Sequence, residues 1–172
     1  MRAYKLEDIS IIQKPVFFDA NVLIYLFWPT GTKYYEENYA KAFNSLRKSG
    51  NELFINFSIV SEVVNRVLRI EYKRYEDNYQ KLKHFRNSDD GEEVLNDIYS
   101  LLEEVILPQF EITDRIFTKS EINDFLTYDD LDFNDKAIAE ICRSEDLILL
   151  TNDSDFKDTD IEILSGHPTF FN

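Results

Sequence analysis

Four acidic residues stand at places in the sequence where carboxylates could act together. Asp19 directly follows the apolar run Val16–Phe18, and Asp153 lies just beyond another apolar run. Glu62 falls in the first turns of an expected helix, and Asp135 in the first turn of a second one. If the four converge on one sheet edge, like charges must either protonate or bind a cation. Oxygen ligands without a Cys or His cluster suit hard ions, so the sequence indicates a Mg²⁺ or Mn²⁺ site.

The segments around these acids alternate between two kinds of pattern. Short apolar runs predict buried strands at residues 16–18, 53–57, 110–112, 146–151 and 161–164. Apolar residues at helical spacing predict helices over residues 34–48, 58–85, 92–107, 118–126 and 132–144. Ser58 is the expected N-cap of the second helix, and Gly50 the expected end of the first. Strands that alternate with helices predict a parallel, doubly wound α/β sheet, with its binding site outside the carboxyl ends of the strands.

Length and composition narrow the class of protein. A chain of 172 residues with 44% apolar and 15% aromatic residues is long and apolar enough for one folded domain over residues 1–172. The longest apolar stretch, Val16 to Trp28, is too short and too polar to span a membrane. The N-terminus has no apolar signal core, and the single Cys142 excludes an internal disulfide. We therefore expect a cytoplasmic protein without membrane contact.

Charge is distributed unevenly along the chain. Residues 1–86 hold 14 basic and 10 acidic side chains, whereas residues 87–172 hold 5 and 23, for a net charge of −14. Proteins that coat duplex nucleic acid carry a basic surface. The acidic net charge of this chain argues against that class of protein. A basic stretch from Arg66 to Arg86 is interleaved with acids; it can be either a phosphate contact or a solvated helix face.

Four segments resemble, in order, the motifs of PIN-domain nucleases. They are Phe17–Tyr25 (FFDANVLIY), Ser58–Asn65 (SIVSEVVN), Phe133–Cys142 (FNDKAIAEIC) and Leu149–Phe156 (LLTNDSDF). The resemblance spans about residues 15–165 and implies a three-layer α/β/α fold with a central, mainly parallel sheet of four to five strands. Residues 69–107 exceed a minimal PIN domain, so we expect a helical extension there that clamps RNA or binds a partner protein.

The resemblance also implies an activity, a cofactor and a set of site residues. The activity is Mg²⁺-dependent endoribonuclease, with Mn²⁺ as a possible substitute, in which water attacks the phosphodiester in line and leaves a 5′-phosphate and a 3′-hydroxyl. The catalytic and metal-binding acids would be Asp19, Glu62, Asp135 and Asp153, with Asp155 as a further metal ligand.

Three polar residues near these acids have two interpretations each. Asn21 and Thr151 could bind a phosphate or water at the site, or make local turn and cap hydrogen bonds. Arg66 lies four residues after Glu62, so it could bind RNA or pair with Glu62 on the helix; we favour the pair.

Within the family, single-domain chains of this size most resemble VapC-type toxins of type II toxin–antitoxin pairs. That resemblance implies a small antitoxin as a partner, and we expect a homodimer. Two alternatives stay open: a PIN-domain RNA-processing nuclease that is no toxin, and a catalytically silent binding module. A phosphohydrolase with Asp19 as nucleophile fits poorly, because such enzymes carry a second Asp where this chain has Asn21.

Overall fold

A single parallel sheet lies at the centre of the fold. The computed structural model describes residues 2–28, 30–113 and 115–171. Within these residues, six strands pair in the order β1-β6-β5-β2-β3-β4, and every neighbouring pair is parallel. The strands are β1 (Arg2–Lys5), β2 (Val16–Phe18), β3 (Leu53–Ile55), β4 (Glu111–Ile112), β5 (Ile148–Leu150) and β6 (Glu162–Ser165). The expected α/β fold class is confirmed, but the expected number of four to five strands is wrong.

The additional strand is β1, at one edge of the sheet. It pairs with β6 from Arg2 opposite Glu162 to Lys5 opposite Ser165. Only Tyr4 of this strand is buried. Central parallel strands are covered on both faces and appear as apolar runs, whereas an edge strand does not need one. Because β1 is polar, no apolar run in the sequence indicated this strand.

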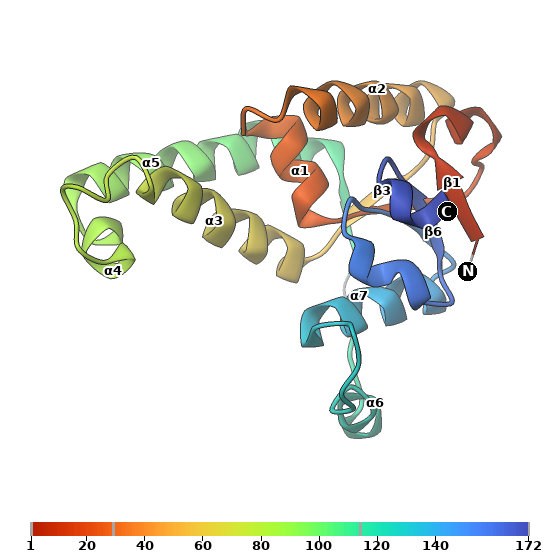
Figure 1. The fold of residues 1–172 in the computed structure, drawn as a ribbon. Coiled ribbons are helices and arrows are strands. Elements are labelled where there is room, and N and C mark those ends of the chain that lie inside the picture. Colours follow the sequence, from red (N-terminus) through yellow and green to blue (C-terminus); the bar gives the residue numbers. More distant parts are fainter. Residues whose placement is uncertain (1, 29, 114, 172) are drawn as a thin grey trace.

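Helices cover both sides of the sheet, with α2 on one side and α7 on the other (Figure 1). The α-helices are α1 (Ala20–Phe27), α2 (Lys33–Ser49), α3 (Phe57–Tyr72), α4 (Leu82–Arg86), α5 (Asp89–Leu101), α6 (Lys119–Asp124) and α7 (Phe133–Ser144). Short 3₁₀ turns are η1 (Leu6–Ile11), η3 (Leu107–Gln109), η4 (Ser154–Asp158) and η5 (Pro168–Phe171), and η2 (Leu102–Ile106) is a π turn. None of the helices in the described residues is long and apolar enough to cross a membrane.

The helix ends follow from local hydrogen bonding. As expected, α2 ends at Gly50, which has a left-handed φ of 76° that glycine adopts without strain. The expected cap of α3 at Ser58 is wrong, because Asn56 takes that place and accepts a hydrogen bond from the Ile59 backbone N at 3.0 Å. Ser58 Oγ instead donates to Asn56 Oδ1 at 2.8 Å.

A helical arm projects from the sheet, and we define it as α3, α4 and α5. Figure 1 shows α3 leaving the sheet, α4 at the far end and α5 returning beside α3. The expected extension at residues 69–107 corresponds to the outer part of this arm and the turns after it. Near the outer end of α3, Trp28 Nε1 donates to the buried Glu71 at 2.8 Å and so fixes the end of α1 to the arm.

The strand order creates an opening at the centre of the sheet. From β2 the chain continues to β3 and β4 on one side, whereas β5 is followed by β6 on the other side. Loops after β2 and β5 therefore leave in opposite directions, which is the arrangement that places ligand sites at a switch point.

Candidate active site

Asp19 sits at the switch point, directly after β2 and at the N-cap of α1. Its backbone N donates to Leu150 O at 3.0 Å, so the residue stays in register with β5. The side chain is only 5% exposed. Its Oδ2 accepts hydrogen bonds from Thr151 Oγ1 and Asn21 Nδ2, each at 2.6 Å. The carboxylate is thus held by residues from both loops of the opening.

The same side chains join the loop after β2 to the loop after β5. Thr151 Oγ1 accepts a hydrogen bond from the Asp153 backbone N at 2.9 Å, which orients the second acid relative to Asp19. Asn21 Oδ1 accepts from the Asn152 backbone N at 3.1 Å. Both donors are backbone N–H groups of the fourth motif. The turn of this motif is therefore held by the side chain of Asn21, from the first motif, and by that of Thr151, which follows β5.

Asn21 and Thr151 are themselves buried, with 7% and 0% of their surface exposed. Their side-chain polar atoms form hydrogen bonds with the Asp19 carboxylate and with the neighbouring backbone. This geometry favours the second of their two interpretations, local hydrogen bonding. It makes them positioning residues for the carboxylate.

The electrostatics of Asp19 reflect this burial. The pKa of Asp19 is raised from 3.8 to about 6, mainly by loss of hydration, and the negative charges of Glu62 and Asp153 contribute to this rise. The hydrogen bond from Thr151 acts in the opposite direction, because it stabilises the ionised form. The influence of Glu62 and Asp153 shows that acids from three separate segments lie within electrostatic reach of one another.

Asp135, in the first turn of α7, belongs to the same group of charges. Burial raises its pKa to about 7, with additional repulsion from Asp132, Asp19 and Asp153. Its backbone N donates to Asp132 Oδ1 at 2.8 Å, the N-cap bond that begins α7. Asp135 at the start of α7 is therefore within electrostatic reach of Asp19 and Asp153.

Glu62 lies on α3 and has the weakest tie to the group. Arg66 Nη1 donates to its Oε1 at 3.1 Å, which is the helical pair that the sequence favoured. Asn134 Nδ2 donates to the other oxygen at 3.4 Å. The contact with Asn134 was not expected, although its position beside Asp135 in the third motif could have suggested it. Glu62 is thus linked to α7 as well as to Asp19.

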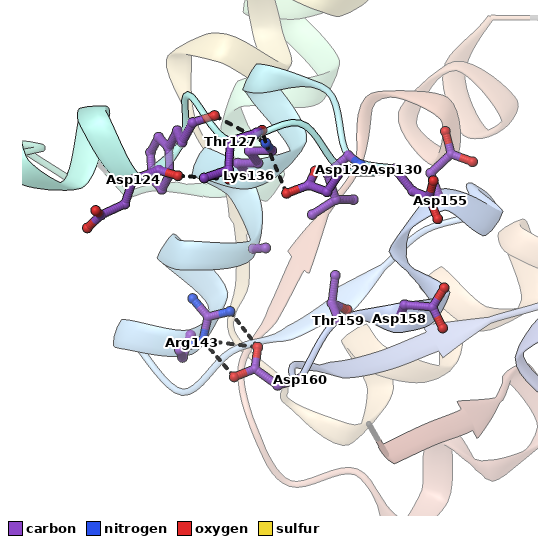
Figure 2. A pocket seen from close by; sticks show the side chains of 13 residues that line it. Asp124, Thr127, Asp129, Asp130, Lys136, Arg143, Asp155, Asp158, Thr159 and Asp160 are labelled. Atoms are coloured by element: carbon purple, nitrogen blue, oxygen red, sulfur yellow. Dashed lines mark hydrogen bonds and ion pairs between the residues drawn. The ribbon is translucent and has the colours of Figure 1, made fainter.

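Asp155 takes a different place. Its side chain is exposed and lines a hollow of about 420 Å³ together with Asp130 and Asp158 (Figure 2). Its backbone N donates to Asp153 Oδ1 at 3.0 Å. Asp155 therefore supports the turn of the fourth motif through its backbone, while its carboxylate faces a separate hollow.

A metal ion is the ligand that the family resemblance implies, and the described residues allow a test of fit. Among them, no group of three or more His, Cys, Asp or Glu side chains lies close enough together to hold an ion. The chemistry of the donors nevertheless fits a hard cation, because they are carboxylates and amides. Within the described residues, neither Asp19 nor Asp135 forms an ion pair that would offset its charge. The charges of these acids raise one another's pKa, but within the described residues the carboxylates do not form a closed set of ligands around an ion.

Tyr39, on α2, is a site residue that the sequence reasoning missed. Its hydroxyl lies 3.1 Å from Thr151 O and 2.9 Å from Asn152 Oδ1, and accepts from the Gly166 backbone N at 3.1 Å. The side chain is fully buried, and burial raises its pKa to about 12, so the hydroxyl stays protonated. Its helical spacing marked it only as core, and nothing in the sequence signals its contact with the fourth motif.

Comparison with known protein families identifies the family to which this site belongs. The PIN domain family matches residues 16–162. The chain belongs to the PIN-domain family. The matched span contains all four motifs that suggested the resemblance, from Asp19 to Asp153, and it leaves β1 outside. A comparison with curated proteins found no match.

PIN domains are generally nucleases, and they typically use divalent metals. The group around Asp19 is therefore the candidate active site of a PIN-domain hydrolase. The position of the site at the switch point agrees with that assignment, since the loops that carry Asp19 and Asp153 are the ones joined by Thr151 and Asn21.

Proposed function

We propose that this PIN domain is a metal-dependent endoribonuclease that hydrolyses RNA phosphodiester bonds. The observation that carries the proposal is the buried carboxylate of Asp19, held at 2.6 Å by Thr151 and Asn21 and repelled by Glu62 and Asp153. A buried, uncompensated negative charge is costly unless a cation or a proton neutralises it. A site that serves only the fold has no need for such a group of charges.

Asp19, Glu62, Asp135 and Asp153 would hold Mg²⁺ or Mn²⁺. When bound, the ion supplies Lewis acidity that activates water and neutralises charge developing on the phosphodiester. The chain itself fixes the oxygen atoms: Thr151 and Asn21 orient Asp19, and the Thr151 hydroxyl orients the Asp153 backbone. Arg66 Nη1 pairs with Glu62 Oε1 at 3.1 Å on α3 and so holds that side chain in place. Asp155 would stay outside this set because its carboxylate faces the hollow of Figure 2.

The proposal is tested by cleavage of RNA with and without divalent ions. We expect cleavage in Mg²⁺ or Mn²⁺, loss of cleavage in excess chelator, and loss in Asp19→Asn. Asp97→Asn, an exposed carboxylate on α5, is the matched control and should keep full activity. Calorimetry with Mn²⁺ adds a readout besides activity, and we expect Asp19→Asn to abolish the binding heat. Undiminished cleavage in chelator would refute the metal-dependent mechanism, and absence of Mn²⁺ binding would favour a silent binding module.

We further propose that the chain is the toxin of a type II toxin–antitoxin pair, that it works in the cytoplasm, and that it forms a homodimer. The support is its size and the order of its motifs, which resemble VapC-type toxins. Induced expression should arrest growth, and co-expression of a small protein encoded beside it should relieve the arrest. Growth unaffected by the active nuclease would favour an RNA-processing role. A single species of monomer mass in solution would contradict the homodimer.

A further inference from the structure

An open groove lies along α3, next to the candidate active site. Its volume is about 720 Å³, within the range of about 300–1,000 Å³ that ligand sites occupy in proteins. Glu62 and Asn134 line it on the side of the acids, and Phe57, Asn65 and Arg69 line it along α3. We call it the α3 groove. Because Glu62 belongs both to this groove and to the group around Asp19, a ligand in the groove would reach the carboxylates.

Phe57, the first residue of α3, presents its ring to solvent in this groove. The residue is 76% exposed. In the part of the chain that the structure describes, its ring stacks on no other aromatic ring. A nucleic-acid base can stack on such a ring whatever its identity, since every base has a π-face.

The groove also carries positive charge, in contrast to the molecule as a whole. Phe57, Asn65 and Arg69 all line the groove, and the exposed Arg69 supplies a cation there. Arg69 is exposed and forms no ion pair within the described residues. Arg66 lines the groove beside Glu62, with which it pairs. An exposed, unpaired arginine near a free aromatic ring matches a phosphate beside an unstacked base.

We propose that the α3 groove binds an unpaired stretch of RNA, with one base stacked on Phe57 and a neighbouring phosphate on Arg69. This proposal rests on the proposed nuclease function and names the kind of substrate that reaches its site. An unpaired strand is required because a base inside a duplex cannot stack on a side chain. A duplex would also extend beyond this one basic face toward the strongly acidic rest of a chain with net charge −14.

The test measures binding in full-length Asp19→Asn protein, in which cleavage is blocked. Fluorescence anisotropy follows an unstructured ten-nucleotide RNA and a hairpin duplex of equal length. We expect Phe57→Ala to weaken single-strand binding about 5- to 100-fold, the loss typical of one base–aromatic stack. Phe57→Trp should restore it. Tyr128→Ala, which removes an even more exposed aromatic side chain elsewhere, should change affinity less than twofold. Because Phe57 is exposed, its removal leaves the core intact, and thermal unfolding checks this.

The role of Arg69 has its own readout, the dependence of affinity on salt. For single strands, each phosphate contact contributes about −0.7 to the slope of log K against log salt concentration. We expect Arg69→Gln to reduce the slope by about that amount. Lys48→Gln, an exposed cation on α2, should leave it unchanged.

The outcomes separate this proposal from the nuclease function. RNA that is cleaved and bound equally well by wild type, Phe57→Ala and Arg69→Gln would overturn the groove and leave the nuclease intact. Tighter binding of the hairpin than of the single strand would also overturn it. Absence of both RNA binding and cleavage would overturn both. Displacement of bound RNA by an acidic peptide, with the variants behaving as expected, would support the groove and show that it can also accept a protein.

Discussion

The carboxylate of Asp19 is charged at a place that water hardly reaches, and this governs how the protein responds to pH. The folded state raises the pKa of Asp19 to about 6 and of Asp135 to about 7, against 3.8 for an unperturbed aspartate. Between pH 3.8 and these raised pKa values, Asp19 and Asp135 are protonated in the folded chain and ionised in the unfolded chain. The stabilisation is complete below pH 3.8 and disappears as the pH rises through 6 to 7.

We therefore predict that the metal-free protein becomes less stable from pH 5 to pH 8. Each excess proton on the folded state contributes a slope of about 1.4 kcal/mol per pH unit. Urea unfolding without divalent ions measures the free energy at each pH. Asp19→Asn should flatten the slope because it removes one of the two groups, and Mn²⁺ should reverse the loss at pH 8. Parallel pH profiles for wild type and Asp19→Asn would contradict the assignment.

Thr151 supports a second prediction at the same scale. Thr151→Val keeps the shape but removes the bond that lowers the pKa of Asp19, and it leaves the Asp153 backbone N without its acceptor. We expect a loss of about 1–3 kcal/mol in stability, together with Mn²⁺ binding that requires a higher pH. Calorimetric titrations at several pH values measure this shift. Thr169→Val, at an exposed threonine, is the control. A loss of stability with no shift in the pH dependence of Mn²⁺ binding would show that Thr151 is only structural, and equal behaviour of the two variants would contradict the prediction.

The candidate site residues were predictable to different degrees. Asp19 and Asp153 follow apolar runs, so their place at the sheet edge could be read from the sequence. The hydrogen bonds from Asn21 and Thr151 to Asp19 could not, because they depend on how the ends of two neighbouring strands face each other. Tyr39 was missed for the same reason: a helical pattern marks a side chain as buried without showing where its hydroxyl ends.

Among the elements, central strands and helix ends with a clear chemical signal were predicted well. The runs that form β2 and β5 are buried on both faces. The helix expected from residue 118 begins there as α6, with a capping box of Thr118 and Glu121. The start of α5 was placed at Glu92, whereas Ser88 caps the helix and Asp89 begins it. A run of polar residues looked like a break there, although acids favour the first turn of a helix.

The link from α2 to the fourth motif gives a prediction at the scale of elements. Tyr39→Phe removes only the hydroxyl that contacts Thr151 O, Asn152 Oδ1 and the Gly166 backbone N. We expect a loss of about 1 kcal/mol in stability and slower cleavage with little change in RNA affinity, since the loop that carries Asp153 loosens. Tyr35→Phe, on the same helix, should have neither effect. A change in affinity alone would place Tyr39 in substrate binding.

The helical arm depends on a close approach between α4 and α5. A Cβ on Gly91 would lie 2.0 Å from Phe85 O, a contact that the backbone must move to avoid. We predict that Gly91→Ala destabilises the arm by several kcal/mol, an overpacking effect that exceeds the typical cost of about 1–3 kcal/mol because backbone is involved. Hydrogen exchange should show faster exchange in α4 and α5, with β2 and β5 still protected. Ser100→Ala is the control on α5, and loss of protection throughout the sheet would show that the arm is not a separate unit.

At the scale of the whole molecule, the distribution of charge limits which RNA can approach. The α3 groove lies in the half of the chain with a small positive charge, while residues 87–172 carry 5 basic and 23 acidic side chains. Asp130 and Asp158 belong to the acidic hollow of Figure 2. Exposed charges act over about 10 Å at 0.1 M salt, so the acidic half repels any RNA that extends past the groove.

We predict that salt affects short and long RNA differently. The affinity for a ten-nucleotide single strand should fall steadily from 20 to 200 mM KCl, because its contacts are with cations. A structured RNA several times longer should lose less affinity over the same range, since salt also screens its repulsion by the acidic half. Anisotropy titrations with the Asp19→Asn protein measure both slopes. The double variant of Asp130→Asn and Asp158→Asn should bring the two slopes closer together, because it removes part of the repulsion. If the two RNAs give identical slopes with the protein that keeps Asp130 and Asp158, long RNA avoids this half of the molecule.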